Sequence, residues 1–488
     1  MAPLPEAPEP DADVIVVGAG PAGMAVSVEL ARAGRRVIVL DMQPQPGGQI
    51  FRGLEENLAE GHALQPLMAA LGPAYAAGAA LIGAFRTTPG IDFRPAHTVW
   101  EVRRDGTVGW LQGAAAGYLR AGHVVLANGA MERPVPFPGW TLPGVMTAGA
   151  VQTLLKAGRM KPAGRVAMAG TGPLIFLLAD QLRRLGVRPV MLARTDRLRD
   201  QIGALPQLRR PALPALAKGL GWLAQLHLAG IAMRRGVTGI EALGDGKVEA
   251  LRLWQGARAT EVPCDLLIVH DGIVPSVDLA QGAGVQIDWN ERLQAWQPAT
   301  RADGQAMPAP GPALVDGPCR VLIAGDARQI AGAEAAMAHG PLVAAALLQQ
   351  DTRQSRVQLR KSLQTRAFLE VAFPPALTTG GPAGTTTVCR CEEIDAATLD
   401  GLIRAGVQDM NQLRGISRCG MGPCQGRHCA VTLARMIRAR TGHAPVPFRA
   451  RPPVRPLPLG ALAALQGRDP ALTGIVSLDD KPVVTTDV

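Results

Sequence analysis

The chain has 488 residues, of which 47% are hydrophobic and 18% charged, and its formal net charge is +10. This length is too great for one ordinary core and predicts two to four domains, while the composition excludes a disordered chain. The basic residues are scattered and only 3% of the residues are aromatic. We therefore expect no nucleic acid as a partner, because single-strand binding needs aromatic side chains beside a basic groove.

The N-terminal region shows neither a leader nor a clear membrane span. Residues 1–13 are acidic and rich in proline, without the basic and apolar regions of a signal peptide. The stretch from His62 to Phe85 carries no charged residue, but Gly72 and Pro73 interrupt it, which favours a buried helix or helix pair. We expect a cytoplasmic protein that is not integral to a membrane.

A dinucleotide-binding βαβ unit is predicted near the N-terminus. Apolar strands at residues 13–17 and 36–40 flank a helical pattern, and the second strand closes on Asp41, where a carboxylate can bind ribose hydroxyls. The turn after the first strand has the pattern G-x-G-x-x-G and comprises Gly18, Ala19, Gly20, Pro21, Ala22 and Gly23. Gly18 permits the tight turn, Gly20 admits a pyrophosphate, and Gly23 lets helix and strand pack closely.

Two later turns resemble those of two-dinucleotide flavoproteins of the glutathione reductase type. One comprises Ala127, Asn128 and Gly129 after an apolar strand, and the other, Gly325-Asp326, precedes a small-residue helix from about Gly332. The resemblance implies an α/β fold with two dinucleotide-binding domains, FAD as cofactor, and Asp326 bonded to its ribityl chain. It also implies a discontinuous FAD-binding domain, about residues 1–150 and 295–350.

A second βαβ unit is predicted within residues 151–294, an NAD(P)-like domain. It has Gly170 and Gly172, but Ile175 stands at the third glycine position and Arg194 at the acid position. Arg194 suits a 2′-phosphate, whereas the branched Cβ of Ile175 opposes a normal pyrophosphate approach. NADPH, another adenine nucleotide and no ligand at all remain open for this domain.

Disulfide reductases of this fold carry a redox C-x4-C motif after the first acid strand, and this chain does not. The corresponding region, residues 46–52, contains Gly47, Gly48 and Gln49 and no cysteine. By the resemblance we assign Gly48 and Gln49 to the cofactor site. Electrons therefore cannot leave the flavin through an active-site disulfide.

Five of the seven cysteines lie near the C-terminus, after a helix and linker predicted at residues 351–387. Four of them have the spacing C-x-C-x32-C-x4-C within a predicted small helical domain, residues 388–440, in which a helix is expected from Pro423 onward. Thiolates are soft ligands, and a bare C-x-C pair is more typical of an iron–sulfur cluster than of structural zinc. A 2Fe–2S cluster is favoured, with zinc and reactive thiols as the alternatives.

This stretch resembles the bacterioferritin-associated-ferredoxin-like 2Fe–2S domain, in the version that ends in GMGPCQGRxC. The resemblance assigns four ligands, namely Cys389, Cys391, Cys424 and Cys429. Cys419 is then a nearby spare thiol. We expect His428 to be solvated or to support a ligand from outside, rather than to be a ligand itself. Cys264 and Cys319 lie in strand or loop contexts and are expected to be inert.

Together these motifs resemble the flavin and iron–sulfur subunit of the hydrogen cyanide synthase, opine oxidase and D-hydroxyproline or proline dehydrogenase family. The resemblance implies an FAD- and 2Fe–2S-containing electron-transfer subunit of an amine or amino-acid dehydrogenase (opine, hydroxyproline, proline or glycine type). The partners that it implies are a second FAD subunit, which oxidises the amine, and in many members a small ferredoxin-like 2Fe–2S subunit. Association with the inner face of the membrane through an electron acceptor stays open.

The alternative function is an NAD(P)H-dependent flavoprotein reductase that feeds its own cluster. Ile175 and Arg194 count against it, and intact cofactor motifs count against a purely structural or sensor protein. No general acid or base is identified, and the catalytic residues stay unknown; His339 and the pair His270-Asp271 are weak candidates. The Pro-rich tail, residues 441–488, is expected to lie on a partner or on the FAD-binding domain.

Overall fold

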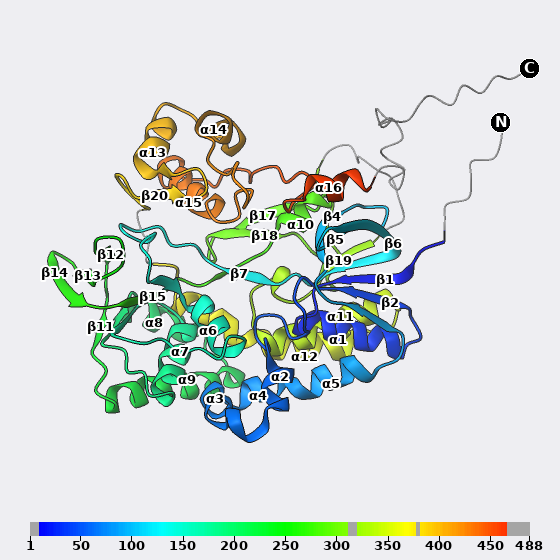
Figure 1. The fold of residues 1–488 in the computed structure, drawn as a ribbon, viewed down its shortest axis with the longest axis horizontal. Coiled ribbons are helices and arrows are strands. Elements are labelled where there is room, and N and C mark those ends of the chain that lie inside the picture. The colour runs from blue at the N-terminus through cyan, green and yellow to red at the C-terminus, as the bar shows by residue number, and fades with distance from the viewer. Residues whose placement is uncertain (1–8, 311–319, 377–380, 466–488) are drawn as a thin grey trace, which may run out of the picture.

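The computed structural model describes residues 9–310, 320–376 and 381–465 (Figure 1). Its first layer is a seven-stranded sheet that contains the predicted N-terminal βαβ unit. In spatial order the strands are β3 (Ile91–Arg94), β2 (Val37–Leu40), β1 (Ala12–Val17), β6 (Ala115–Leu126), β5 (Thr107–Gln112) and β4 (Thr98–Val102), and β19 (Arg320–Ile323) pairs with β6. The first sheet is thus built from two separate stretches of the chain.

Helices α1 (Pro21–Arg32) and α11 (Ala333–Leu347) cover one face of this sheet and pack against each other. The contact is close because Gly340 has no side chain: a Cβ there would lie 2.5 Å from the Cβ of Ala25. The apolar side chains of both helices join those of the sheet in one buried core. This packing brings α11 and the turn that precedes it against the glycine turn before α1.

The second layer contains the second predicted βαβ unit, which is therefore confirmed. Its five-stranded sheet has the order β11 (Met233–Arg235), β10 (Met191–Arg194), β9 (Val166–Gly170), β15 (Leu266–His270) and β8 (Val145–Thr147). Three helices that accompany it are α6 (Ala148–Lys156), α7 (Pro173–Arg184) and α9 (Leu213–Leu228). A meander of β12 (Gly239–Leu243), β13 (Ala250–Gln255) and β14 (Arg258–Pro263) extends this unit, and the ribbon β7 (Ala130–Glu132) with β16 (Ile273–Pro275) lies between the two sheets.

The charge-free stretch after the first βαβ unit folds as short helices. They are α2 (Leu54–Ala59), just before the stretch, η1 (Gly61–Leu64), α3 (Gln65–Leu71), α4 (Pro73–Ala76) and α5 (Gly78–Thr87). The chain bends by 115° at the break after Leu71, where Gly72 and Pro73 stand. No single helix among the described residues is long and apolar enough to cross a membrane.

The cysteine-rich domain follows the long helix α12 (Arg353–Ala372) and lies at one end of the molecule (Figure 1). Its elements are β20 (Thr387–Cys389), β21 (Ile394–Asp395), α13 (Ala396–Arg404), α14 (Met410–Ser417) and α15 (Ala430–Thr441). The domain shares a core with Trp296 and Leu293, in or beside the ribbon of β17 (Ile287–Asn290) and β18 (Ala295–Pro298).

The expectation of a helix from Pro423 onward is wrong. The chain from Cys419 to Cys429 forms turns, and α15 begins only at Ala430. Gly420, Gln425 and Gly426 have φ angles of 89°, 50° and 82°, in the left-handed region that a right-handed helix excludes. The loop therefore curls around the thiols instead of extending away from them.

The Pro-rich tail lies on its own first sheet. The backbone N–H of Val454 donates to the carbonyl oxygen of Trp100 on β4 at 2.9 Å. Further along, Ala461 in α16 (Leu459–Ala463) and Leu465 pack on the same Trp100 side chain. Of the two surfaces expected for this segment, the structure thus supports the chain's own domain for the described residues up to 465.

Candidate functional site

The glycine turn between β1 and α1 brings three backbone segments to near contact. Gly18 has a φ of 106°, and a Cβ there would lie 2.5 Å from the carbonyl oxygen of Ala127 in the small-residue turn after β6. A Cβ at Gly23 would overlap the carbonyl oxygen of Gly18. Both positions therefore require glycine, and the N-terminus of α1 meets the ends of β1 and β6 without intervening side chains.

The free N-terminus of α1 is a place where a phosphate can bind. No described side chain caps this helix, and Gly20 is its N-cap with a φ of −75°. The first intrahelical bond is donated by Met24 to the oxygen of Gly20, so the preceding amides point outward with the positive end of the helix dipole.

The Gly47-Gly48-Gln49 segment lies directly against this turn. The N–H of Gly47 donates to the carbonyl oxygen of Ala19 at 2.8 Å. A Cβ at Gly48, whose φ is 60°, would come within 2.9 Å of the Cα of Gly20. Gly20 and Gly48 thus lie side by side at the N-terminus of α1, where a side chain on either one would narrow the approach of a pyrophosphate to the backbone.

Asp41 stands at the end of β2 and is buried. Its carboxylate accepts N–H groups of Ala19 at 2.6 Å and Gln43 at 2.7 Å. Burial raises the pKa of Asp41, and these two hydrogen bonds act in the opposite direction. The sequence places this carboxylate correctly at the strand end, and the structure adds that it also fixes the backbone of the glycine turn.

The Gly325-Asp326 turn meets the N-terminus of α1, although 300 residues separate the two in sequence. A Cβ at Gly325 would lie 2.6 Å from the Cβ of Ala22. One carboxylate oxygen of Asp326 accepts N–H groups of Ala331 and Gly332, which fixes its orientation at the start of α11. Burial raises the pKa of Asp326.

His339 lies on α11 behind this turn and is buried. Its Nδ1 accepts the N–H of Gly325 at 3.1 Å, so Nε2 carries the proton, and Nε2 has no partner among the described residues. Burial, together with the smaller effect of the Arg328 charge, lowers the pKa of His339 to about 3. The ring is therefore neutral at physiological pH and holds the Gly325-Asp326 turn in place.

Lys156 is a buried group that sequence reasoning missed. Its Nζ donates to the carbonyl oxygen of Gln49 at 3.2 Å and lies 5.7 Å from the ring centroid of Tyr75. Burial lowers the pKa of Lys156 to about 8, and the nearby charge of Arg52 adds to this effect. No local pattern could have revealed it, because the contact joins residues 107 positions apart.

In the second unit, two threonines stand at the carboxyl ends of the strands, the edge at which open α/β sheets take their ligands. The hydroxyls of Thr171 and Thr195, at the carboxyl ends of β9 and β10, are buried and find no partner among the described residues. Ile175 is fully buried in the core beneath α7. Its side chain fills the space that a third glycine would leave between helix and strand.

Arg194 is not available to bind a 2′-phosphate in this arrangement. Its guanidinium makes two hydrogen bonds to Asp196, at 3.0 and 2.7 Å, and lies 4.9 Å from the ring centroid of Phe176. Arg235 also pairs with Asp196. The positive charge of Arg194, which on the sequence alone suits a 2′-phosphate, is therefore already balanced by the carboxylate of Asp196.

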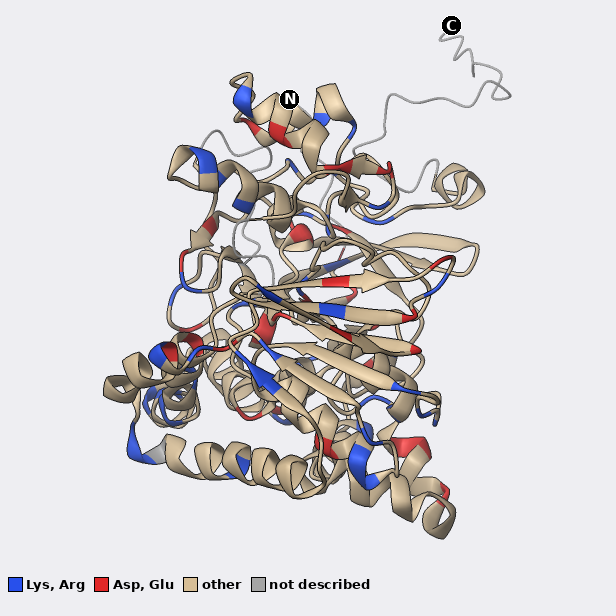
Figure 2. Ribbon diagram, turned by 90° about the vertical axis from the view of Figure 1, so that its left-hand side faces the viewer, with Lys and Arg blue, Asp and Glu red and all other residues tan. Residues whose placement is uncertain are grey.

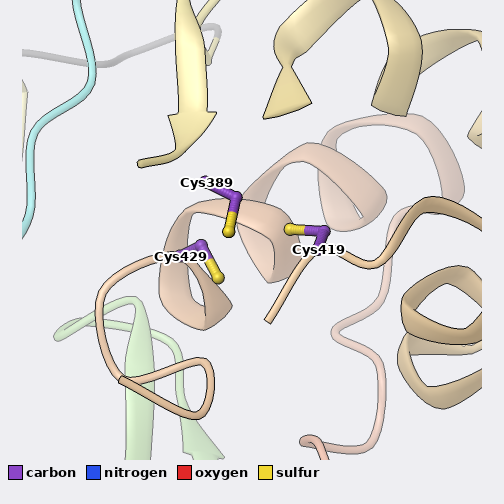
Figure 3. Close-up of side chains that lie close together, drawn as sticks. All are labelled: Cys389, Cys419 and Cys429. Carbon is purple, nitrogen blue, oxygen red and sulfur yellow. The ribbon is translucent and has the colours of Figure 1, made fainter. Parts of the chain in front are cut away.

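The C-terminal thiols form an inner group and an outer pair. Cys389, Cys419 and Cys429 are buried, and their sulfur atoms lie within 4.8 Å of one another (Figure 3). They come from the end of β20, from the loop after α14 and from the residue before α15. Cys391 and Cys424 hydrogen-bond to each other at the more exposed rim.

The sulfur atoms share protons and repel one another's charge. Hydrogen bonding among the three inner sulfur atoms lowers the pKa of Cys389 and raises those of Cys419 and Cys429. The thiol of Cys429 also donates to the carbonyl oxygen of Gly426 at 3.9 Å.

A backbone hydrogen bond at Cys424 lowers the pKa of Cys391, but burial and the sulfur atoms of Cys424 and Cys389 raise it overall. The charge of Cys424 also adds to the rise in the pKa of Cys419. All five sulfur atoms are therefore close enough to influence one another's charge, and the three inner ones lie within 4.8 Å of one another. We call this group of five cysteines the thiol pocket, and its soft sulfur donors suit a soft metal or a cluster.

The predicted ligands are thus divided between the two groups. Cys389 and Cys429 belong to the inner group and Cys391 and Cys424 to the outer pair, while Cys419, expected to be a spare, lies inside the inner group. The loop closes tightly over the outer pair, since a Cβ at Gly422 would overlap the Cβ of Cys391. The sequence found the pocket but could not rank the five cysteines by depth.

The remaining candidates take structural or peripheral places. Cys264 is buried in the core of the second unit, and burial raises the pKa of its thiol to about 11. His270 pairs with Glu132, with 2.6 Å between Nδ1 and the carboxylate, and His428 is exposed. Cys319 lies outside the described residues.

Comparison with known proteins agrees with this geometry. Residues 12–296 match the pyridine nucleotide-disulphide oxidoreductase family, and residues 384–466 match the sarcosine oxidase A3 domain. The chain is similar to an opine oxidase subunit of Agrobacterium tumefaciens, with 37% identity over 97% of this chain and 96% of that protein. It is similar to hydrogen cyanide synthase subunit HcnB of Pseudomonas protegens, with 32% identity over 92% and 96%.

Among solved structures, L-proline dehydrogenase from P. horikoshii has the same fold. It superposes with a TM-score of 0.66 over 92% of this chain and 79% of that one, at 20% sequence identity. The two-dinucleotide α/β fold that the glycine motifs predict is therefore confirmed.

The buried His339 predicts a specific pH dependence of stability. Because its pKa is lower in the folded protein than in the unfolded chain, the unfolded state binds a proton first as the pH falls below about 6.5, and stability is lost from there toward pH 3. His339→Asn keeps an acceptor for Gly325 without this titration. Chemical denaturation at pH 7 and pH 5 should show the wild type losing about 2 kcal/mol more than the variant.

The exposed His62 provides the control, since His62→Asn should follow the wild type at both pH values. Equal pH dependence in the wild type and His339→Asn would show that His339 is protonated as easily in the folded protein as in the unfolded chain.

Proposed function

The chain belongs to the pyridine nucleotide-disulphide oxidoreductase family, and to the flavoprotein subunits related to those of opine oxidase and to HcnB, and we propose that it is the FAD- and 2Fe–2S-containing electron-transfer subunit of a multi-subunit amine or amino-acid dehydrogenase. The observation that carries this proposal is the presence, in one chain, of a dinucleotide cradle without a redox disulfide and of three buried sulfur atoms within 4.8 Å of one another, with two further cysteines at their rim. The substrate would be an opine, hydroxyproline, proline or glycine.

The residues of the first unit fit FAD. The amides at the N-terminus of α1, with Gly18, Gly20, Pro21, Ala22 and Gly23, would hold the pyrophosphate, and Gly48, Gln49, Ala127 and Gly129 would border it. Asp41 would take the adenosine ribose, and Asp326 with Gly325 the ribityl chain. When bound, FAD accepts two electrons together and releases them one at a time.

A cluster held by the thiol pocket is the proposed carrier that takes electrons from the flavin. We propose Cys389, Cys391, Cys424 and Cys429 as ligands of a 2Fe–2S cluster, two to each iron, with Cys419 beside Cys389. The three inner sulfur atoms would also supply three of the four ligands of a tetrahedral zinc ion, since they all lie within 4.8 Å of one another. Zinc is therefore the alternative that iron and sulfide analysis must exclude.

The second unit is proposed to bind an adenine nucleotide, or nothing, rather than to accept hydride from NADPH. The unpartnered hydroxyls of Thr171 and Thr195 among the described residues support a ligand at this edge. The pairing of Arg194 with Asp196 argues against a 2′-phosphate. The alternative of an NAD(P)H-dependent reductase would require flavin reduction by NADPH or NADH alone.

We also propose that this chain works with partner subunits. The chain is similar to proteins whose names mark them as subunits of larger enzymes, and we propose a second FAD subunit that oxidises the amine and passes its electrons here. A small ferredoxin-like 2Fe–2S subunit would extend the chain of carriers. We place the complex in the cytoplasm, with an electron acceptor at the inner face of the membrane.

The flavin and the cluster should be separable by mutation. Gly20 has a φ of −75°, which valine tolerates, so Gly20→Val changes the pyrophosphate path and not the backbone. We expect the purified variant to lose at least about nine-tenths of its FAD, because a blocked phosphate path removes the main contacts of the cofactor. Iron content should stay at the wild-type level.

Gly122→Val, on the exposed side of strand β6 in the same sheet, is the control and should keep both cofactors. Retention of FAD by Gly20→Val would count heavily against the cradle.

The ligand set should be resolved by single serine variants of the five C-terminal cysteines. With the proposed quartet, Cys419→Ser keeps the electron paramagnetic resonance signal of the reduced cluster, and Cys424→Ser loses it, because a serine alkoxide is a harder and poorer ligand for iron. Iron, zinc and sulfide are measured in each variant, and Cys264→Ala serves as a control cysteine outside the pocket. Loss of iron in Cys419→Ser with retention in Cys391→Ser or Cys424→Ser would redraw the quartet around the inner group.

A further inference from the structure

Helix α9 carries an apolar stripe that faces solvent. Its members recur every three or four residues along one side and are Leu213, Ala217, Leu220, Ala224 and Leu228. The leucines among them are 49%, 58% and 78% exposed. The opposite side of the helix packs on α7 through Leu223 and the fully buried Leu226. We call the stripe the α9 face.

A second stretch of uncharged chain lies along the same edge of the molecule as the α9 face. Figure 1 places α9, α3 and α4 along the lower edge of the molecule, and Figure 2 shows the long, almost uncharged α9 along this edge from the side. Both α3 and α9 pack on α7, so they flank the same helix. Residues 61–85, which include α3 and α4, contain no charged side chain. More apolar surface lies just before α9, where Ile202 and Leu205 are exposed.

The charged side chains in the segment that carries the α9 face are basic. Residues 201–240 contain no aspartate or glutamate. Arg209 and Arg210, just before α9, and Lys218 on its flank are basic residues beside the stripe. The ammonium group of Lys218 lies 5.4 Å from the ring centroid of Trp222, which keeps it at the border of the stripe. An apolar stripe with a basic border matches a surface that is apolar inside and anionic at its boundary.

We propose that the α9 face binds the surface of an anionic lipid bilayer, with its leucines among the acyl chains and its basic residues among the headgroups. A protein partner is the less suitable occupant, since protein interfaces are crossed by about one hydrogen bond per 100–200 Å². The side chains of the α9 face are alanine and leucine, which form no hydrogen bonds. Acyl chains require none. The proposal concerns membrane attachment and does not depend on which cofactors the chain holds.

The test uses the full purified chain and vesicle flotation. Wild type should float with vesicles of equimolar phosphatidylglycerol and phosphatidylcholine, and much less with phosphatidylcholine alone. The double variant Leu220→Glu with Leu228→Glu should bind at least about tenfold more weakly, because it places two charges among acyl chains. Arg209→Glu with Arg210→Glu should also weaken binding about tenfold or more, and only to the anionic vesicles.

Leu459→Glu is the matched control, because Leu459 is 84% exposed but lies on α16, away from the α9 face. It should float within about twofold of the wild type, and thermal unfolding should confirm that every variant is folded. Absence of wild-type binding to the anionic vesicles would overturn the proposal, as would unchanged binding of the Leu220/Leu228 variant. A wild type that ignores vesicles but forms oligomers that this variant abolishes would assign the α9 face to a protein contact instead.

Discussion

The close approach of helix α1 to the ends of strands β1 and β6 is the constraint on which the first unit depends. Any side chain at Gly23 would overlap the carbonyl oxygen of Gly18, and any at Gly18 would press on Ala127. Because helix and strands meet backbone to backbone, the amides of α1 lie where a pyrophosphate can reach them. The Gly325-Asp326 turn then docks on the same helix terminus, and the buried ring of His339 holds it there.

A second constraint ties the cysteine-rich domain to the dinucleotide-binding body. Arg133 is buried, and its guanidinium donates to the carbonyl oxygens of Asp271, Leu293 and Gln294. These bonds join β7, the end of β15 and the ribbon β17–β18, which shares a core with the cysteine-rich domain. Burial lowers the pKa of Arg133 to about 10, so the side chain stays charged at physiological pH. One buried cation thus ties the ribbon that packs on the cysteine-rich domain to β7 and to the end of β15.

Much of this organisation could be predicted from the sequence because its signals are local. Both βαβ units, the Gly-Asp turn and the cysteine pocket follow from strand and helix periodicity and from glycine and cysteine spacing. The failures are of two kinds. The helix expected from Pro423 is replaced by left-handed turns at Gly420, Gln425 and Gly426, which composition alone did not reveal. The second kind of failure concerns contacts in space. That Asp196 neutralises Arg194, and that Cys419 lies among the inner sulfur atoms, depends on how the backbone curves.

The central claim is that one chain holds a two-electron flavin and a one-electron cluster. Anaerobic titration of the purified chain with dithionite, followed by visible absorption and electron paramagnetic resonance, tests it most directly. Since FAD takes up two electrons and a 2Fe–2S cluster takes up one, the account predicts about three electrons per chain and a cluster signal from the reduced protein. An uptake of two electrons with no such signal, together with bound zinc, would contradict it.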